Sequence, residues 1–135
     1  MASVYKEFLI NVEPARAWAA VRDYGGVMRL VPDLVADCHL EGDTRVVTFK
    51  DGRVAREILV DINDGRRRLV YAEPGGRFIT RSASVQVFAD GEKRSRVVWI
   101  NDVLPDEFAP LIDANMEKGG ASMKNALEKA IVCSS

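Results

Sequence analysis

The sequence has very little of the chemistry on which metal sites, disulfide frameworks and nucleophilic triads are built. Its 135 residues include one histidine, His39, and two cysteines, Cys38 and Cys133. A lone histidine supports neither a histidine-ligated metal site nor a Ser-His-Asp or Cys-His arrangement, and the cysteines form no CxxC pair. We expect no metal and no cofactor, an exposed or structural His39, and a Cys38 that packs as a small core residue.

The chain also lacks an excess of charge of one sign and any long apolar run. The net charge is -1, which does not favour a nucleic-acid partner. The basic stretches 66–68 and 93–96 follow turns and lack interleaved aromatic residues, so we expect solvated strand positions. No run approaches the roughly 20 apolar residues of a membrane span, and Lys6 and Glu7 interrupt the first apolar stretch. These absences predict a cytoplasmic protein with no nucleic-acid partner and no stable membrane insertion.

Apolar residues make up 47% of the chain, enough for a sizeable core in one domain spanning 1–135. Residues 3–12 alternate and are rich in β-branched and aromatic side chains, which predicts a strand. Pro14 suits the first turn of a helix that Gly25-Gly26 ends. The apolar stretch 27–31, which stops before Pro32, predicts a second, short helical piece.

From residue 34 to residue 105 the pattern is that of six successive strands. The turn signals between them are Gly42-Asp43, Asp51-Gly52, Asp64-Gly65, Gly75-Gly76 and Asp90-Gly91. Links this short join antiparallel neighbours.

After Pro105 the apolar spacing becomes helical, with Asp106 expected as N-cap and Pro110 in the first turn. One stripe of this long helix carries Phe108, Ile112, Met116, Gly119, Met123, Leu127 and Ile131.

Seven strands and one long helix predict an α+β fold in which a curved antiparallel sheet wraps the helix. One helix cannot fill a curved sheet of this size, so we expect an internal pocket of several hundred Å³.

The chain resembles the polyketide cyclase/dehydrase and lipid-transport group of the START/Bet v 1-like superfamily. The resemblance covers nearly the whole chain and is carried by the order and spacing of "VEPARAWAAVRDYGGVMRLVPDLVADCHLEG", "DGRVAREILVDIND", "RLVYAEPGG", "SRVVWINDVLP" and "GGASMKNALEKA". It implies the helix-grip fold: a seven-stranded antiparallel sheet around a long C-terminal helix, with two short helices after the first strand. The fold serves many roles, so it does not by itself define the function.

The strand over residues 53–64 can be read in two ways. Val54, Arg56, Ile58, Val60 and Ile62 form its more apolar face, which hydrophobicity alone would turn inward. The resemblance instead implies that the glutamate of "AREIL", Glu57, points into the pocket together with Ala55, Leu59 and Asp61. If so, the apolar face is partly uncovered and a homodimer becomes plausible.

The same registration turns further side chains inward and places three charges, on Glu57, Glu73 and Arg81, in a largely apolar lining. Because a buried charge is costly unless paired, Arg81 should pair with Glu57 or Glu73, or meet a ligand anion. The candidate ligand-binding residues are Leu30, Glu57, Tyr71, Glu73, Phe78, Arg81, Trp99, Asn101 and Met116.

Three functions fit these features. The first is a binding or carrier domain for an apolar or aromatic small molecule such as a lipid or polyketide. The second is a polyketide cyclase or dehydratase with Glu57, Glu73 and Tyr71 as acid/base groups and Arg81 polarising a carbonyl. The third is an interaction module similar to the coenzyme Q-binding branch. Residues 27–31 form either a static cap on the core or a lid hinged at Gly25-Gly26 that faces Gly75-Gly76 across the pocket entrance.

Overall fold

The computed structural model describes residues 1–75 and 78–134, with side chains up to residue 129. In chain order the elements are β1 (Ala2–Ile10), α1 (Pro14–Arg22), η1 (Tyr24–Gly26), α2 (Val27–Leu30), β2 (Val35–Glu41), β3 (Thr44–Phe49), β4 (Val54–Asn63), β5 (Arg68–Pro74), β6 (Thr80–Ala89), β7 (Ser95–Leu104), η2 (Asp106–Phe108) and α3 (Ala109–Ser134). Gly76 and the side chains of Ile131 and Cys133 lie outside the described residues.

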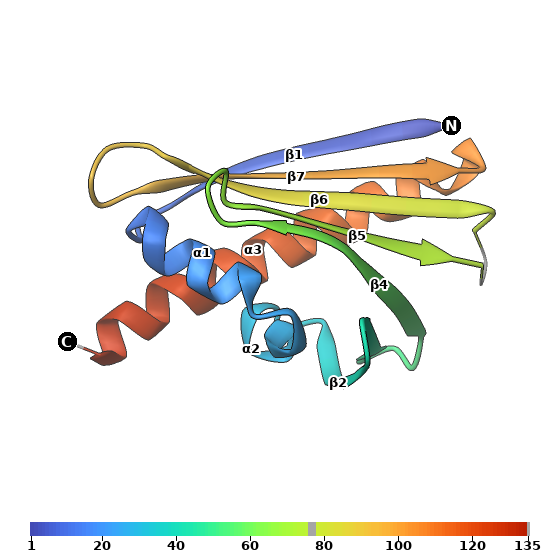
Figure 1. The fold of residues 1–135 in the computed structure, drawn as a ribbon, viewed down its shortest axis with the longest axis horizontal. Helices are drawn as coiled ribbons and strands as arrows, with labels where there is room; N and C mark the ends of the chain where they lie inside the picture. The colour runs from blue at the N-terminus through green and yellow to red at the C-terminus, as the bar shows by residue number, and fades with distance from the viewer. Residues whose placement is uncertain (76–77, 135) are drawn as a thin grey trace.

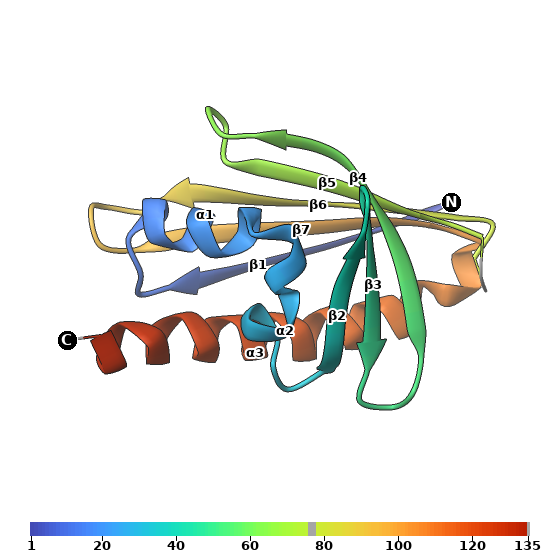
Figure 2. The same ribbon diagram turned by 60° about the horizontal axis from the view of Figure 1, so that its bottom comes forward.

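All seven strands belong to one antiparallel sheet with the order β1-β7-β6-β5-β4-β3-β2. Consecutive strands from β2 to β7 pair with each other, as the short turns predicted, and β1 closes onto β7. The 26-residue helix α3 lies along one face of the curved sheet, with α1 and α2 beside it (Figures 1 and 2). The predicted helix-grip fold is confirmed.

The hairpin between β3 and β4 fixes which residues of the two strands meet. The Phe49 amide donates to the carbonyl of Arg53 at 2.8 Å, and Gly52 has a φ of 91°. This is a three-residue turn with glycine in the left-handed region. It sets Arg45 directly opposite Glu57.

A bulge at Val60 reverses the alternation within β4. The ladder to β5 pairs Leu59 with Tyr71 and then Asp61 with Val70, so one extra residue is inserted. The prediction that Asp61 shares the inner face was therefore wrong: Asp61 is exposed, and Ile62 packs against the core.

Helix α3 begins at Ala109, two residues later than expected. Asp106 is not its N-cap but lies in the 3₁₀ turn η2, and no side chain caps that turn. Pro110 does fall in the first turn of α3. The stripe facing the sheet is confirmed where side chains are described, because Ile112 and Met116 are buried, as are Met123 and Leu127.

The glycine pair within α3 lets two aromatic rings approach the helix backbone. A methyl group at Gly119 would lie 3.0 Å from the Trp99 ring, and one at Gly120 would lie 2.9 Å from the Phe8 ring. The contact at Gly120 is shorter than real Cβ contacts and that at Gly119 is tighter than most of them, so these glycines fit the close approach of β1 and β7.

The segment after α1 differs from its prediction. Helix α1 ends at Arg22, before the glycine pair, and Gly25-Gly26 belongs to η1 instead of ending the helix. Val27, Leu30 and Val31 are buried, whereas Met28 is 43% exposed. Figures 1 and 2 place α2 well away from the end of β5 at Pro74. In the part of the segment that the structure describes, α2 thus does not face Gly75.

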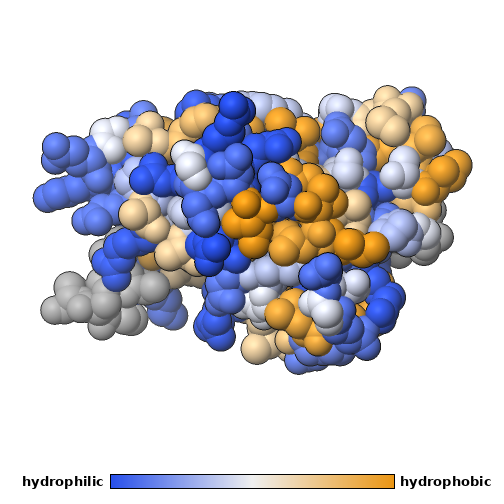
Figure 3. Space-filling model, viewed as in Figure 1, coloured by the Kyte–Doolittle hydropathy of each residue, from blue (hydrophilic) through white to orange (hydrophobic). Residues whose placement is uncertain are grey.

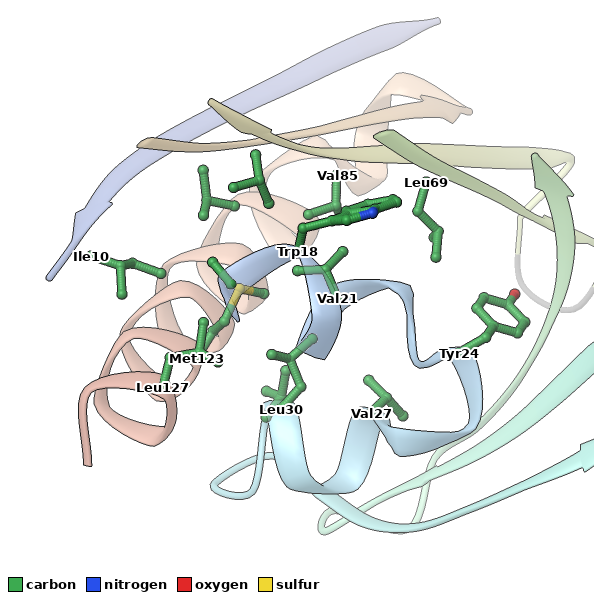
Figure 4. Close-up of a cluster of buried hydrophobic side chains, with 14 of the residues drawn as sticks. Ile10, Trp18, Val21, Tyr24, Val27, Leu30, Leu69, Val85, Met123 and Leu127 are labelled. Carbon is green, nitrogen blue, oxygen red and sulfur yellow. The ribbon is translucent and has the colours of Figure 1, made fainter. Parts of the chain in front are cut away.

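The main core lies between the sheet, α3 and the helices after β1. Figure 4 shows side chains from these elements pointing into one interior: Ile10, Trp18, Val21, Tyr24, Val27, Leu30, Leu69, Val85, Met123 and Leu127. A smaller cluster at the other end of α3 contains Val4, Phe78, Val103, Ile112 and Met116. The site described next lies where the two clusters approach each other.

Candidate ligand-binding site

A cavity of about 100 Å³ lies between the sheet, α2 and α3. Its lining is mainly apolar and includes Val27, Leu30, Val31, Trp99 and Met123. Polar side chains reach it from neighbouring central strands of the sheet. The cavity is smaller than the several hundred Å³ predicted, because α2 and residues 31–35 fill part of the space beneath the sheet.

Arg81 is at the centre of a buried network of charges. Its Nε donates to Glu73 at 2.8 Å and its Nη2 to Glu57 at 2.6 Å. Its Nη1 donates to Oδ1 of Asn101 at 2.8 Å. The prediction left open a pairing with either glutamate or a ligand anion; the structure pairs Arg81 with both glutamates.

Arg45 completes the network and was missed in the sequence. Its Nε donates to Glu57 at 2.7 Å. Its guanidinium carbon lies 4.2 Å from the ring centre of Tyr24 and 4.7 Å from that of Tyr71. The Tyr24 hydroxyl in turn donates to the Glu57 carbonyl at 2.7 Å. The available signal was the hairpin Asp51-Gly52, whose three-residue turn sets Arg45 opposite Glu57.

The two arginines determine the protonation state of Glu57. Burial by itself would raise the pKa of this carboxyl, but the guanidinium groups of Arg45 and Arg81 more than offset it and hold the pKa below its ordinary value. Burial raises the pKa of the Tyr24 and Tyr71 hydroxyls. Glu57 is therefore an anion at neutral pH, and both tyrosines are protonated.

Seven of the nine predicted site residues line the cavity: Leu30, Glu57, Tyr71, Arg81, Trp99, Asn101 and Met116. The other two do not. Glu73 is buried behind Arg81 and holds it by a hydrogen bond. Phe78 belongs to the smaller core cluster and packs edge-to-face on Phe108 at 5.1 Å between ring centres.

The cavity continues into a wider hollow of about 480 Å³ at the surface. Leu34, Phe49, Arg53 and Asn115 line both spaces. Arg53 lies over the Phe49 ring, with 4.0 Å from its guanidinium carbon to the ring centre. The hollow thus adjoins the cavity between α3 and the β3–β4 hairpin, and no described residue from 74 to 79 lines either space.

Other features that the sequence singled out lie away from this cavity. His39 is on the edge strand β2 with 55% of its side chain exposed. Cys38 is half-buried, and burial raises the pKa of its thiol. Among the described residues no group of histidine, cysteine and carboxylate side chains is arranged to hold a metal ion, and no described helix is long and apolar enough to cross a membrane.

A curved seven-stranded sheet gripping a long helix, with a partly polar cavity between them, defines the START/Bet v 1-like class. Residues 1–130 match the family model described as polyketide cyclase / dehydrase and lipid transport. The chain belongs to this family. A search of curated protein sequences gave no significant match.

Solved structures support the same fold. A putative uncharacterized protein from Bacillus thuringiensis superposes with a TM-score of 0.84 at 20% identity, covering 93% of this chain and 98% of the other. Norcoclaurine synthase from Thalictrum flavum, in complex with dopamine and hydroxybenzaldehyde, superposes with a TM-score of 0.74 at 15% identity. The match covers 97% of this chain and 86% of the synthase. The di-domain ARO/CYC BexL of the BE-7585A biosynthetic pathway superposes with a TM-score of 0.81 at 13% identity, covering 95% of this chain and 47% of BexL. At these identities the likeness is one of fold.

Proposed function

We propose that this protein binds or carries a small, largely apolar molecule in the cavity between the sheet and α3. The observation that carries the proposal is the cavity itself, because apolar side chains line most of it and a few convergent polar groups stand on rigid strands. That combination is typical of small-molecule sites. Membership of a family that includes lipid transport supports it.

The protonation states favour binding over the cyclase or dehydratase alternative. A general base works best when its pKa lies near the operating pH. Both Glu57 oxygens accept hydrogen bonds from arginines, and the pKa of Glu57 is lowered. Glu73 lies outside the lining. The cavity therefore offers proton donors and fixed charges, but Glu57 is poorly placed to take a proton from a substrate.

Native mass spectrometry of the purified protein, followed by denaturing analysis of what is released, tests the proposal. We expect a retained small molecule, or a mass increase when a small aromatic compound is added. A quinone among the released compounds would favour the coenzyme Q-binding-like alternative. A turnover product formed from an added polyketide would favour the cyclase. Protein that retains nothing and takes up no added compound would contradict the binding function.

We also propose that the outer face of β4 mediates a homodimer. Val54, Ile58 and Val60 on this face are 54%, 40% and 58% exposed, and Figure 3 shows apolar surface over β4 and β5. A patch of this kind often marks an interface. Light scattering coupled to gel filtration should give the mass of a dimer for the wild type and of a monomer for Val60→Glu. A monomeric wild type at high concentration would contradict the proposal.

A further inference from the structure

We propose that the cavity selects an uncharged molecule of about one ring that carries a hydrogen-bond-accepting oxygen, held by the Tyr71 hydroxyl and the Asn101 amide. The inference rests on the proposed binding function and specifies its ligand class. It depends on which donors and acceptors of the buried network are already used.

Each side-chain carboxylate and amide oxygen that faces the cavity already accepts a hydrogen bond from an arginine. Glu57 Oε1 accepts from Arg45 at 2.7 Å and Oε2 from Arg81 at 2.6 Å. Asn101 Oδ1 accepts from Arg81 at 2.8 Å. A ligand donor could use only the second lone pair of an oxygen that already accepts a charge-assisted hydrogen bond, whereas a ligand acceptor meets donors that have no partner.

Donors, by contrast, remain available. The Tyr71 hydroxyl oxygen accepts from Trp99 Nε1 at 3.2 Å, and among the described residues no acceptor is in place for its own proton. Arg81 fixes the orientation of the Asn101 amide, so that Nδ2 is a donor, and it too has no acceptor in the described part of the chain. Every fully buried polar side-chain atom described has a partner. The Asn101 Nδ2 is thus in contact with open space, and Asn101 lines the cavity.

The charge balance at the polar end of the cavity disfavours an anionic ligand there. Arg45 and Arg81 are neutralised by Glu57 and Glu73, all four at 8% residue exposure or less. A ligand carboxylate at the polar end, beside Tyr71 and Asn101, would add a third negative group where these two cations are already paired. It would lose its hydration without gaining an unpaired partner, and buried charge without a partner is strongly unfavourable. Arg53, the third arginine of the lining, lies over the Phe49 ring at the side shared with the surface hollow.

The cavity volume limits the ligand to roughly one ring. An engineered apolar cavity of about 150 Å³ holds benzene, and the volume here is about 100 Å³, so one ring is the upper limit and its entry requires the lining side chains to move. A ring between Leu30, Trp99 and Met123 would leave its oxygen to the polar end of the cavity, where Tyr71 and Asn101 stand.

Three compounds of similar size separate the effect of ligand charge from that of a hydrogen-bond acceptor. Acetophenone has a carbonyl and no charge, benzoate is an anion, and ethylbenzene has no acceptor. Titrations at pH 7 followed by amide chemical shifts should rank acetophenone first, with the other two at least about tenfold weaker, as one or two net hydrogen bonds predict. Tyr71→Phe should lower acetophenone affinity about five- to tenfold and leave ethylbenzene binding unchanged.

Tyr24→Phe is the matched control. It removes the same group from the other tyrosine stacked on Arg45, but that hydroxyl donates to the Glu57 carbonyl and Tyr24 is not part of the lining. Its acetophenone affinity should stay within about twofold of wild type. The wild-type ranking needs no variant, so the inference is tested even if one variant fails to fold.

Benzoate binding as tightly as acetophenone would overturn the inference, and so would ethylbenzene doing the same. In either case the protein still binds a small molecule, and the proposed function stands. A retained natural ligand that proves to be a carboxylic acid would likewise refute the inference alone. If none of the three compounds binds and the purified protein retains nothing, the proposed function fails with it.

Discussion

Replacing Arg81 by alanine tests how strongly the fold depends on the buried network. The side chain of Arg81 is 8% exposed and that of Glu57 is 7% exposed. Arg81 donates to three groups: Glu57, Glu73 and Asn101. The substitution leaves the Glu73 carboxylate without its hydrogen-bond donor and Glu57 with Arg45 alone. It turns a neutral cluster into one with net charge -1.

The expected cost is about 3–5 kcal/mol, the range for removing one partner of a buried ion pair. Arg22→Ala is the matched control, because Arg22 also pairs with a carboxylate but its side chain is 46% exposed and that of Asp64 is 64% exposed. An exposed pair of this kind contributes about 0–1 kcal/mol. Urea unfolding monitored by circular dichroism, with the denaturant slope held equal, gives both free energies of unfolding.

The loss in Arg81→Ala should also depend on pH. In the wild type the lowered pKa of Glu57 stabilises the fold above the ordinary value of 4.5, and this contribution is lost as pH falls through the lower, folded value. In the variant the stranded carboxylates are more easily protonated, so the deficit relative to wild type should shrink between pH 7 and about pH 4.5. An Arg81→Ala loss no larger than that of Arg22→Ala, constant over this range, would refute the reasoning.

Two further predictions concern α3 and the segment after α1. Gly120→Ala should destabilise the folded protein by about 1–2 kcal/mol although alanine is the better helix former, because its methyl group would lie 2.9 Å from the Phe8 ring. In thermal unfolding, the double variant with Phe8→Leu should recover most of the lost stability. No recovery would show that the clash is not the cause. The lid hypothesis predicts that acetophenone slows amide hydrogen exchange in residues 27–31 more than in β6, whereas equal protection with and without the compound would leave only a static cap over the cavity.

The fold could be predicted from the sequence because its local signals agree. The Asp-Gly turns, the alternation of the strands and the apolar stripe of α3 each specify the same arrangement, and such consistency is what makes a fold readable. Details that depend on tertiary contacts were missed. The start of α3 at Ala109 instead of Glu107, and the 3₁₀ turn at Gly25-Gly26, follow from packing that no local signal records.

The candidate site was partly predictable for the same reason. Tyr71, Arg81 and Asn101 followed from the inward face that the family resemblance implies for Glu57, carried by alternation along uninterrupted strands. Arg45 required the length of one hairpin turn, since a two-residue turn would have set it opposite Ile58 instead of Glu57. A single residue of register moves every side chain of a strand to the other face. The volume of the cavity was overestimated because alternation says nothing about how far α2 reaches beneath the sheet.

Strand β4 shows why hydrophobicity alone chooses the wrong face. Burying Glu57 is unfavourable in isolation, but Arg45 from β3 and Arg81 from β6 converge on its two oxygens. The two arginines that stabilise the buried carboxylate come from other strands, so no pattern within residues 53–64 can reveal them. The apolar residues of the opposite face remain exposed as a consequence, and Val60, the bulged residue, is the most exposed of them. The register of β4 therefore determines both its polar inner face and its apolar outer face. A partner that covers Val60 and a ligand that meets the network would act on opposite faces of the same strand.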